Sequence, residues 1–143
     1  MSTKKRKSNK GILLKGILEK VPKESFDVLR KELKDILSGN SGIYALYKKD
    51  RVVYVGLATD LYWRNFHHLT RDRLVGKWDS FSIFIIQRVR YLKDLETLVL
   101  RISKPKYNKA TGKLPHHHFL KKRLRKVAKT LKNEAQGIEL ALR

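Results

Sequence analysis

The feature that most constrains the fold of this chain is a pair of apolar runs separated by a short charged stretch. GIYALY at 42–47 and VVYVG at 52–56 are rich in β-branched and aromatic residues, and Lys48–Arg51 lies between them. This pattern predicts a β-hairpin. Because strand side chains alternate between the faces of a sheet, the register decides whether Tyr44 and Tyr54 share a face. A plain two-residue turn would separate them, whereas an odd-length loop or a bulge would bring them together.

The segments after this hairpin alternate between helix and strand patterns. We expect a helix over about 60–72 capped by Thr59, a buried strand over 81–89, and a helix over 92–102 that ends before Pro105. The predicted order of elements is therefore β-β-α-β-α. This order corresponds to a small α/β (α+β) domain around a three-stranded sheet that contains antiparallel strands.

Basic segments flank this core on both sides, and each is predicted to contain a helix. Residues 1–40 comprise a lysine-rich tail and an accessory helix over 25–38. Residues 110–143 comprise a basic loop and an amphipathic helix from about 118 to 135. The core between them spans 41–109. Neither flank has the spacing of a zinc finger or a helix-turn-helix, so neither predicts which bases would be read.

Charge gives the strongest indication of a partner. The chain has 34 Lys+Arg against 13 Asp+Glu, a net charge of +21 that is spread along its whole length. Such an excess favours a nucleic acid, because basic side chains release the counterions condensed on phosphates. A basic ribosome-associated protein is the simpler alternative. The residues expected to contact phosphate are Lys77, Lys121, Lys122, Arg123 and Arg125, whereas the neighbouring Trp78 is expected in the core.

The composition also excludes several classes of protein. The chain has no cysteine, which excludes disulfide-linked partners, thiolate metal clusters and a cysteine nucleophile. No apolar run approaches the roughly 20 residues that cross a bilayer. The basic N-terminus is not followed by the apolar segment of a secretory signal. We therefore expect a protein without a membrane partner, cytoplasmic and nucleoid-associated, or nuclear in a eukaryote.

Two residues of the helix predicted at 60–72 have side chains suited to a phosphate. Arg64 and His68 are four residues apart and share one face of that helix. An arginine offers a planar fork to two phosphate oxygens, and a histidine can donate or accept a proton. An ordinary solvated helix face would carry the same two residues, so this spacing alone leaves both interpretations open.

Glu96 stands out on the helix predicted at 92–102. It lies at the border of the apolar stripe formed by Leu92, Leu95 and Val99, where a carboxylate is costly unless it is paired or bound to a metal. Mg²⁺ often takes one or two carboxylates and fills its other positions with water and phosphate oxygens. A salt bridge to a nearby basic residue explains the position equally well.

Taken together, these residues resemble the GIY-YIG nuclease family. The resemblance rests on GIY at 42–44, YVG at 54–56, Arg64 and His68 on the following helix, Glu96 on a later helix and Asn108 within PKYN. It covers about half of the chain, from residue 41 to 109. Each short motif is weak by itself, but the elements occur in the family's order with suitable spacing.

The resemblance implies a metal-dependent DNA endonuclease, a phosphodiester hydrolase that nicks DNA or cuts both strands. Tyr44 would activate or orient the attacking water, with Tyr54 hydrogen-bonded in the same site. Arg64 would stabilise charge on the scissile phosphate, and Glu96 would ligate a single Mg²⁺ or Mn²⁺. Asn108 would support the site by hydrogen bonding, and His68 matches a position that varies among members.

A catalytically silent DNA- or RNA-binding module on the same scaffold is the main alternative. The joint presence of the family's site residues argues against it, because a decayed enzyme would be expected to have lost at least one. The sequence leaves open the group that takes the proton, the DNA that is preferred and the oligomeric state.

Overall fold

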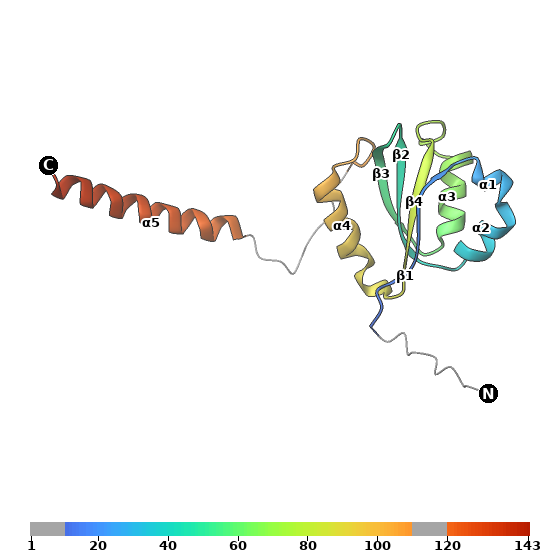
Figure 1. Ribbon diagram of the computed structural model, residues 1–143, viewed down its shortest axis with the longest axis horizontal. Helices are drawn as coiled ribbons and strands as arrows, with labels where there is room; N and C mark the ends of the chain where they lie inside the picture. The colour runs from blue at the N-terminus through green and yellow to red at the C-terminus, as the bar shows by residue number, and fades with distance from the viewer. Residues whose placement is uncertain (1–10, 110–119) are drawn as a thin grey trace. The chain divides into compact units, whose positions relative to one another are not determined.

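A computed structural model describes residues 11–109 and 120–143, which belong to two compact units described here separately. The first unit contains a four-stranded antiparallel sheet in the order β1-β4-β2-β3 (Figure 1). Its strands are β1 (Leu14–Pro22), β2 (Gly42–Lys48), β3 (Arg51–Ala58) and β4 (Ser80–Ile86). Its helices are α1 (Ser25–Val28), α2 (Arg30–Leu37), α3 (Leu61–Thr70) and α4 (Leu92–Ser103), the last preceded by the 3-10 turn η1 (Val89–Tyr91).

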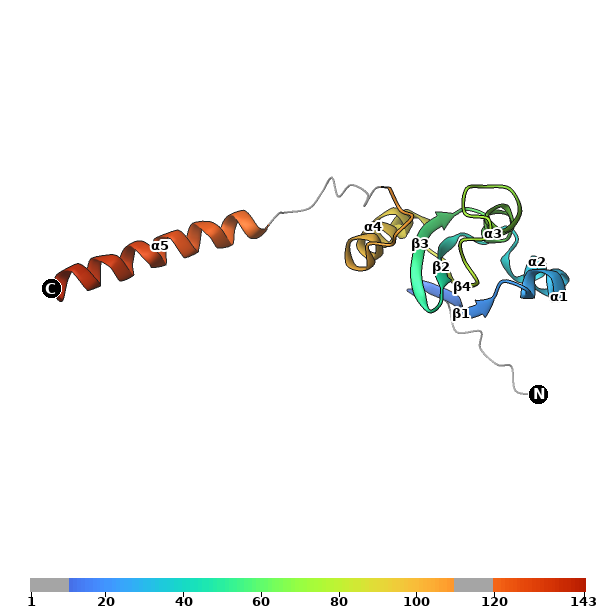
Figure 2. The same cartoon turned by 90° about the horizontal axis from the view of Figure 1, so that it is seen from above.

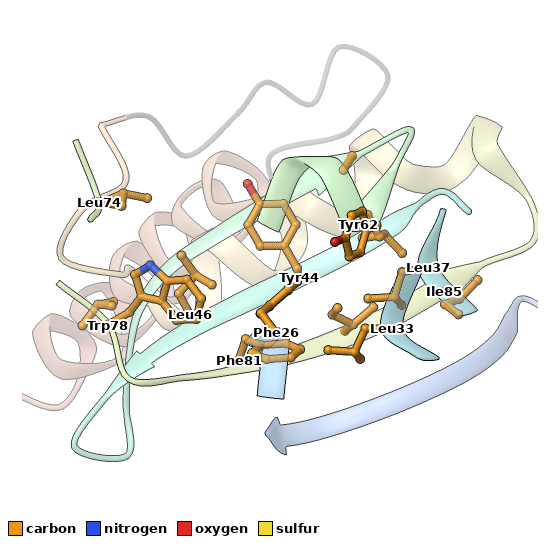
Figure 3. Packing of buried hydrophobic residues seen from close by; sticks show 14 residues of the cluster. Phe26, Leu33, Leu37, Tyr44, Leu46, Tyr62, Leu74, Trp78, Phe81 and Ile85 are labelled. Atoms are coloured by element: carbon orange, nitrogen blue, oxygen red, sulfur yellow. The ribbon is translucent and has the colours of Figure 1, made fainter. Parts of the chain in front are cut away.

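The sheet separates two layers of helix. In Figure 2, α4 covers one face, and α1, α2 and α3 lie on the other. Each face has its own apolar cluster. The larger cluster joins Tyr44 and Phe81 of the sheet to residues of α1, α2 and α3, and it includes the buried Trp78 as expected (Figure 3). The smaller cluster packs Ile43 and Val55 against α4.

The predicted three-stranded sheet is wrong in its strand count, because β1 forms a fourth strand. β1 pairs with β4 at the edge of the sheet, and its register shifts twice along its length. Lys20, at one of these irregularities, has a left-handed backbone with φ of 47°. Ile17 remains 52% exposed. The segment therefore lacks the regular alternation of apolar and polar residues by which a strand is recognised in a sequence.

The hairpin of β2 and β3 has a two-residue turn and a bulge. Lys49 and Asp50 both have positive φ, 48° and 64°, as a tight type I′ turn requires. Leu46 pairs with Tyr54, but the next residue of β2 pairs with Val52, so one residue of β3 is extra. This bulge restores a shared face, as one of the two predicted routes required. Tyr44 and Tyr54 lie on that face as diagonal neighbours, because Gly56 stands directly opposite Tyr44.

Asp60, and not Thr59 as predicted, caps α3. The Asp60 carboxylate accepts hydrogen bonds from the backbone N–H of Trp63 at 3.2 Å and from that of Gly39 at 2.9 Å. One side chain therefore fixes both the start of α3 and the turn that follows α2. α3 ends at Thr70, two residues before its predicted end.

The second unit is described from Leu120, where α5 (Leu120–Ala141) begins as one continuous 22-residue helix. It extends six residues beyond the predicted end at about 135. All its side chains are exposed. Within the described residues, no helix combines the length and the apolar character that crossing a membrane requires.

Candidate active site

Two motif glycines allow close packing of the strands that carry the site. Tyr44 is completely buried on β2, and its ring lies over Gly56 of β3. A Cβ added to Gly56 would overlap the Tyr44 ring, and one added to Gly42 would overlap the carbonyl oxygen of Phe84 on β4. The glycines of the GIY and YVG motifs are therefore required for close packing, here between a ring and a backbone and between two strands.

The Tyr44 hydroxyl is the centre of a cluster of polar and aromatic side chains. It hydrogen-bonds His68 Nε2, and it accepts a hydrogen bond from Arg64 Nε at 3.2 Å. The ring centroid of Tyr54 lies 6.0 Å from that of Tyr44 and 5.2 Å from that of His68. The structure thus brings together four of the predicted site residues, two from the hairpin and two from α3.

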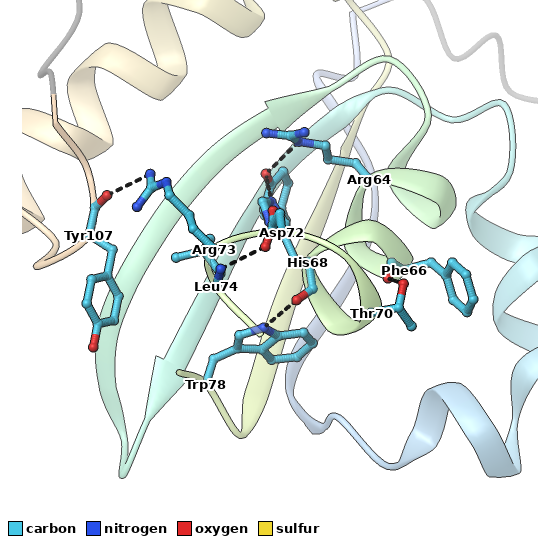
Figure 4. Close-up of polar contacts among 10 residues, drawn as sticks. Arg64, Phe66, His68, Thr70, Asp72, Arg73, Leu74, Trp78 and Tyr107 are labelled. Atoms are coloured by element: carbon cyan, nitrogen blue, oxygen red, sulfur yellow. Dashed lines mark hydrogen bonds and ion pairs between the residues drawn. The ribbon is translucent and has the colours of Figure 1, made fainter. Parts of the chain in front are cut away.

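His68 has a second partner that the sequence analysis missed. His68 Nδ1 hydrogen-bonds the carboxylate of Asp72, and that carboxylate also accepts from the backbone N–H of Leu74 at 2.8 Å (Figure 4). An N–H donated to the carboxylate places the proton on Nδ1 and leaves Nε2 to accept from the Tyr44 hydroxyl. The spacing of four residues between His68 and Asp72 was the available signal, but Asp72 lies beyond the end of α3.

Burial keeps both Tyr44 and His68 neutral near pH 7. Burial raises the pKa of the Tyr44 hydroxyl well above its ordinary value, the neighbouring Tyr54 raises it further, and Arg64 opposes both. Burial lowers the pKa of the His68 imidazole to about 4, against the favourable charge of Asp72. The two groups therefore meet as a neutral phenol and a neutral imidazole, an arrangement able to pass a proton along one line.

Asn108 lies at the outer edge of β3. Its side-chain NH₂ donates to the carbonyl of Val55 at 2.7 Å, and its side-chain oxygen accepts from the N–H of Val55 at 2.9 Å. The preceding Tyr107 N–H donates to the carbonyl of Val53 at 2.8 Å, and Arg73 donates to the carbonyl of Tyr107 at 3.0 Å. These bonds hold the strand that carries Tyr54.

Glu96 lies on α4. Its side chain makes no hydrogen bond to the Tyr44 cluster, the group formed by Tyr44, Tyr54, Arg64 and His68. Its side chain is 14% exposed, and its Oε2 is buried with no hydrogen-bond partner. Lys93, one turn earlier and mostly exposed, approaches that oxygen to 3.6 Å. A buried carboxylate oxygen with only this loose ion pair has coordination capacity left for a hard cation.

A metal at Glu96 would depend on ligands from outside the protein. Among the residues that the structure describes, no group of three or more His, Cys, Asp or Glu side chains is arranged to hold a metal ion. One carboxylate supplemented by water and phosphate oxygens is a mode that Mg²⁺ accepts. The residues present therefore fit a weakly held Mg²⁺ or Mn²⁺ that binds together with a phosphate.

The basic residues expected to contact phosphate are exposed. Lys77 lies before β4 with its ammonium 5.0 Å from the ring centroid of Tyr107. Lys121, Lys122, Arg123 and Arg125 lie in the first two turns of α5.

Comparison with solved structures identifies the fold. The N-terminal endonuclease domain of UvrC from Thermotoga maritima, in a point mutant bound to its catalytic divalent cation, matches with a TM-score of 0.50 and 22% identity, covering 59% of this chain and 98% of that domain. Two further point mutants of the same domain, also with the divalent cation, match with a TM-score of 0.50 and 21% identity, and the coverage is unchanged. The chain has a GIY-YIG nuclease fold. Neither protein-family models nor curated protein sequences match the chain.

The GIY-YIG fold explains why residues distant in sequence meet. In this chain the hairpin of β2 and β3 supplies Tyr44 and Tyr54, and α3 supplies Arg64 and His68. Of the elements observed outside the predicted core, the helix α5 was expected from the sequence and the strand β1 was not.

Proposed function

We propose that this protein is a metal-dependent endonuclease that hydrolyses phosphodiester bonds of DNA. The observation that carries the proposal is the connected line of side chains formed by Arg64, Tyr44, His68 and Asp72. In such a line the cation can stabilise charge on a phosphate, and the hydroxyl, imidazole and carboxylate can take up the proton of an attacking water.

The Tyr44 oxygen would receive the proton of the attacking water while its own proton passes to His68 Nε2. The lowered pKa of His68 keeps the imidazole in the neutral form that accepts this proton. Asp72 would stabilise the imidazolium that results, because it already accepts the Nδ1–H. Arg64 is exposed, and its guanidinium donates a hydrogen bond to the Tyr44 hydroxyl. From this position it would stabilise the charge that develops on the phosphate.

Glu96 would hold the divalent cation, and Asn108 would hold β3 in place. The cation, when bound, polarises the phosphate and stabilises the leaving oxygen. The Oε2 of Glu96 supports this role, because it is buried, has no hydrogen-bond partner and makes only a 3.6 Å ion pair with Lys93. The catalytic divalent cation of the UvrC domain lends further support.

DNA would be gripped through phosphate contacts spread over the chain. A net charge of +21 supports a polyanionic substrate, and Lys77 with the basic residues at the start of α5 would make such contacts. The protein would accordingly be associated with the nucleoid, or with nuclear DNA in a eukaryote. One site cuts one strand, so a monomer would nick.

Nicking of supercoiled plasmid, with Mg²⁺, with Mn²⁺ and with EDTA, tests the proposal. Wild type is expected to nick only with a divalent cation, and Glu96→Gln and Arg64→Ala to lose at least about a hundredfold in rate. Lys93→Ala is the matched control on α4, because it removes a charge one turn from Glu96 and leaves the carboxylate.

Two results would contradict the assignment. A Glu96→Gln variant that nicks at the wild-type rate would remove Glu96 from the metal site. A wild type that binds plasmid but does not nick it with either cation would favour the silent binding module.

A further inference from the structure

α5 exposes an apolar stripe that runs along its whole length. Leu120, Leu124, Val127, Leu131 and Ile138 are 51–67% exposed, although each projects from the same side of the helix. A 22-residue helix is about 33 Å long. A stripe of large apolar residues on an otherwise charged helix indicates a partner surface, because helices of this kind obtain most of their stability from packing.

The spacing of this stripe is that of a coiled-coil seam. The intervals from Leu120 through Leu124 and Val127 to Leu131 are four, three and four residues, and Ile138 follows after seven. This is the alternation of the a and d positions of a heptad, with a at Leu124, Leu131 and Ile138 and d at Leu120 and Val127. The remaining a and d positions are Glu134 and Ala141.

Most charged residues of α5 lie away from this seam. Beside the seam, the e and g positions in the central and C-terminal parts are small or uncharged: Ala128, Thr130, Ala135 and Gly137. Most of the basic residues fall at b, c and f, on the opposite side of the helix. A second helix could therefore approach the stripe closely while the basic side stays in solvent.

Glu134 lies in the seam, Lys121 (position e) and Arg123 flank it, and the pair of Glu134 and Arg123 decides the orientation of a partner helix. Arg123 occupies g and Glu134 occupies d. In an antiparallel pair that places Val127 beside Leu131, Glu134 of each copy lies next to Arg123 of the other copy. In a parallel pair, Glu134 would face the same carboxylate of the second copy across an apolar seam, which is costly.

We propose that α5 is a self-association helix that pairs antiparallel with α5 of a second copy of this chain. The paired apolar faces would be buried, and the basic b, c and f positions of both helices would form the outer surface. The dimer would carry two copies of the core, and, resting on the function proposed above, its two sites could act on the two strands of one duplex.

The mass of the full chain in solution, measured by light scattering and by sedimentation over about a hundredfold range of concentration, tests the proposal. The expected species at high concentration has twice the 16.8 kDa mass of the chain. Measurement in nuclease-treated protein at high salt removes dimers bridged by DNA, and an apolar seam persists under these conditions.

A pair of matched variants localises the contact. Leu131→Glu, in the centre of the stripe, is expected to weaken association at least about tenfold. Leu140→Glu makes the same substitution at a residue that is 64% exposed on the opposite side of the same helix, and association is expected to be unchanged. Equal loss in both variants would overturn the assigned seam.

Charge exchange tests the orientation and does not depend on the folding of a single variant. Arg123→Glu alone and Glu134→Lys alone each place like charges together in the antiparallel pair and are expected to weaken it severalfold. The double variant restores opposite charges, so its association should return to within about twofold of wild type. A double variant no better than the singles would overturn the antiparallel arrangement. A wild-type chain that stays monomeric at all concentrations would overturn self-association itself.

Discussion

Gly56 is the position where a single methyl group tests the link between the fold and the site. In Gly56→Ala, the new Cβ would lie 2.6 Å from Cζ and 2.9 Å from Cε1 of Tyr44, and closer still to the hydroxyl. The Tyr44 ring is fully buried and bonded to Arg64 and His68, so it cannot move without breaking these contacts. The backbone at Gly56 does not have a positive φ, so the effect is steric and not conformational.

The expected cost follows from two opposed effects. Overpacking of a closed site costs about 1–3 kcal/mol. Replacing a strand glycine by alanine returns about 0.5–1 kcal/mol of backbone entropy. Contacts below 3.0 Å to a buried ring indicate the upper end of the first range. Gly56→Ala should therefore lower the free energy of unfolding by about 2 kcal/mol, and the melting temperature by about 4–8 °C for each kcal/mol. Plasmid nicking should fall further than stability does, because the Tyr44 hydroxyl is displaced.

Urea unfolding followed by tryptophan fluorescence measures the change in stability. Gly16→Ala in β1 is the control, because its Cβ would meet only the flexible end of Ile85 at 3.3 Å. In a Tyr44→Ala background the clash is absent, so Gly56→Ala should cost about 1–3 kcal/mol less than it does in wild type. The reasoning fails if Gly56→Ala unfolds at the wild-type urea concentration, or if its cost is the same in both backgrounds.

Three further predictions concern the polar contacts. Asp72→Asn should keep the fold but slow nicking at least about tenfold, because the carboxylate that stabilises a protonated imidazole is lost; an unchanged rate would remove Asp72 from the site. Asn108→Ala breaks two hydrogen bonds to β3 and should lower the free energy of unfolding, measured in urea, by about 1–3 kcal/mol. A decrease of less than about 0.5 kcal/mol would show that these hydrogen bonds do not stabilise the fold. The pKa of His68 is about 4 in the folded protein and about 6.5 in the unfolded chain. Between these two pH values the unfolded chain binds more protons than the folded protein. The free energy of unfolding therefore decreases as the pH is lowered through this range, by up to about 1.4 kcal/mol per pH unit. His68→Gln should flatten this part of the pH–stability curve, and an equally steep curve in the variant would contradict the assignment.

The sequence was sufficient to predict which residues lie close together where they belong to one hairpin or one helix. Tyr44 and Tyr54 belong to one hairpin, and Arg64 and His68 share a helix face, so short motifs and helical periodicity determine most of the cluster. The bulge that puts both tyrosines on one face was foreseen as a requirement. Its place at Val53 depends on packing around the strand and was not foreseen.

Other features depend on contacts that no local pattern records. β1 is an edge strand with an interrupted register and an exposed Ile17, so its burial pattern does not alternate. Asp72 lies just beyond the end of α3 at Thr70, where its carboxylate also accepts a hydrogen bond from Leu74 N–H, so helical periodicity alone did not assign it to His68. The lack of a hydrogen-bond partner for Glu96 Oε2 follows from how α4 packs on the sheet, which the sequence alone does not give.

The hydrogen bonds of Asn108 have a consequence for the solubility of the domain. β3 is an edge strand of the sheet. Backbone N–H and C=O groups on the outer side of an edge strand can pair with a strand of another chain if nothing covers them. Tyr107 and Asn108 form hydrogen bonds with the backbone groups of Val53 and Val55. The segment after α4 therefore blocks this edge of the sheet from pairing with another strand. A chain shortened to end before Pro105 would expose that edge, and it would be expected to aggregate through β3 even if every residue of the Tyr44 cluster were still present.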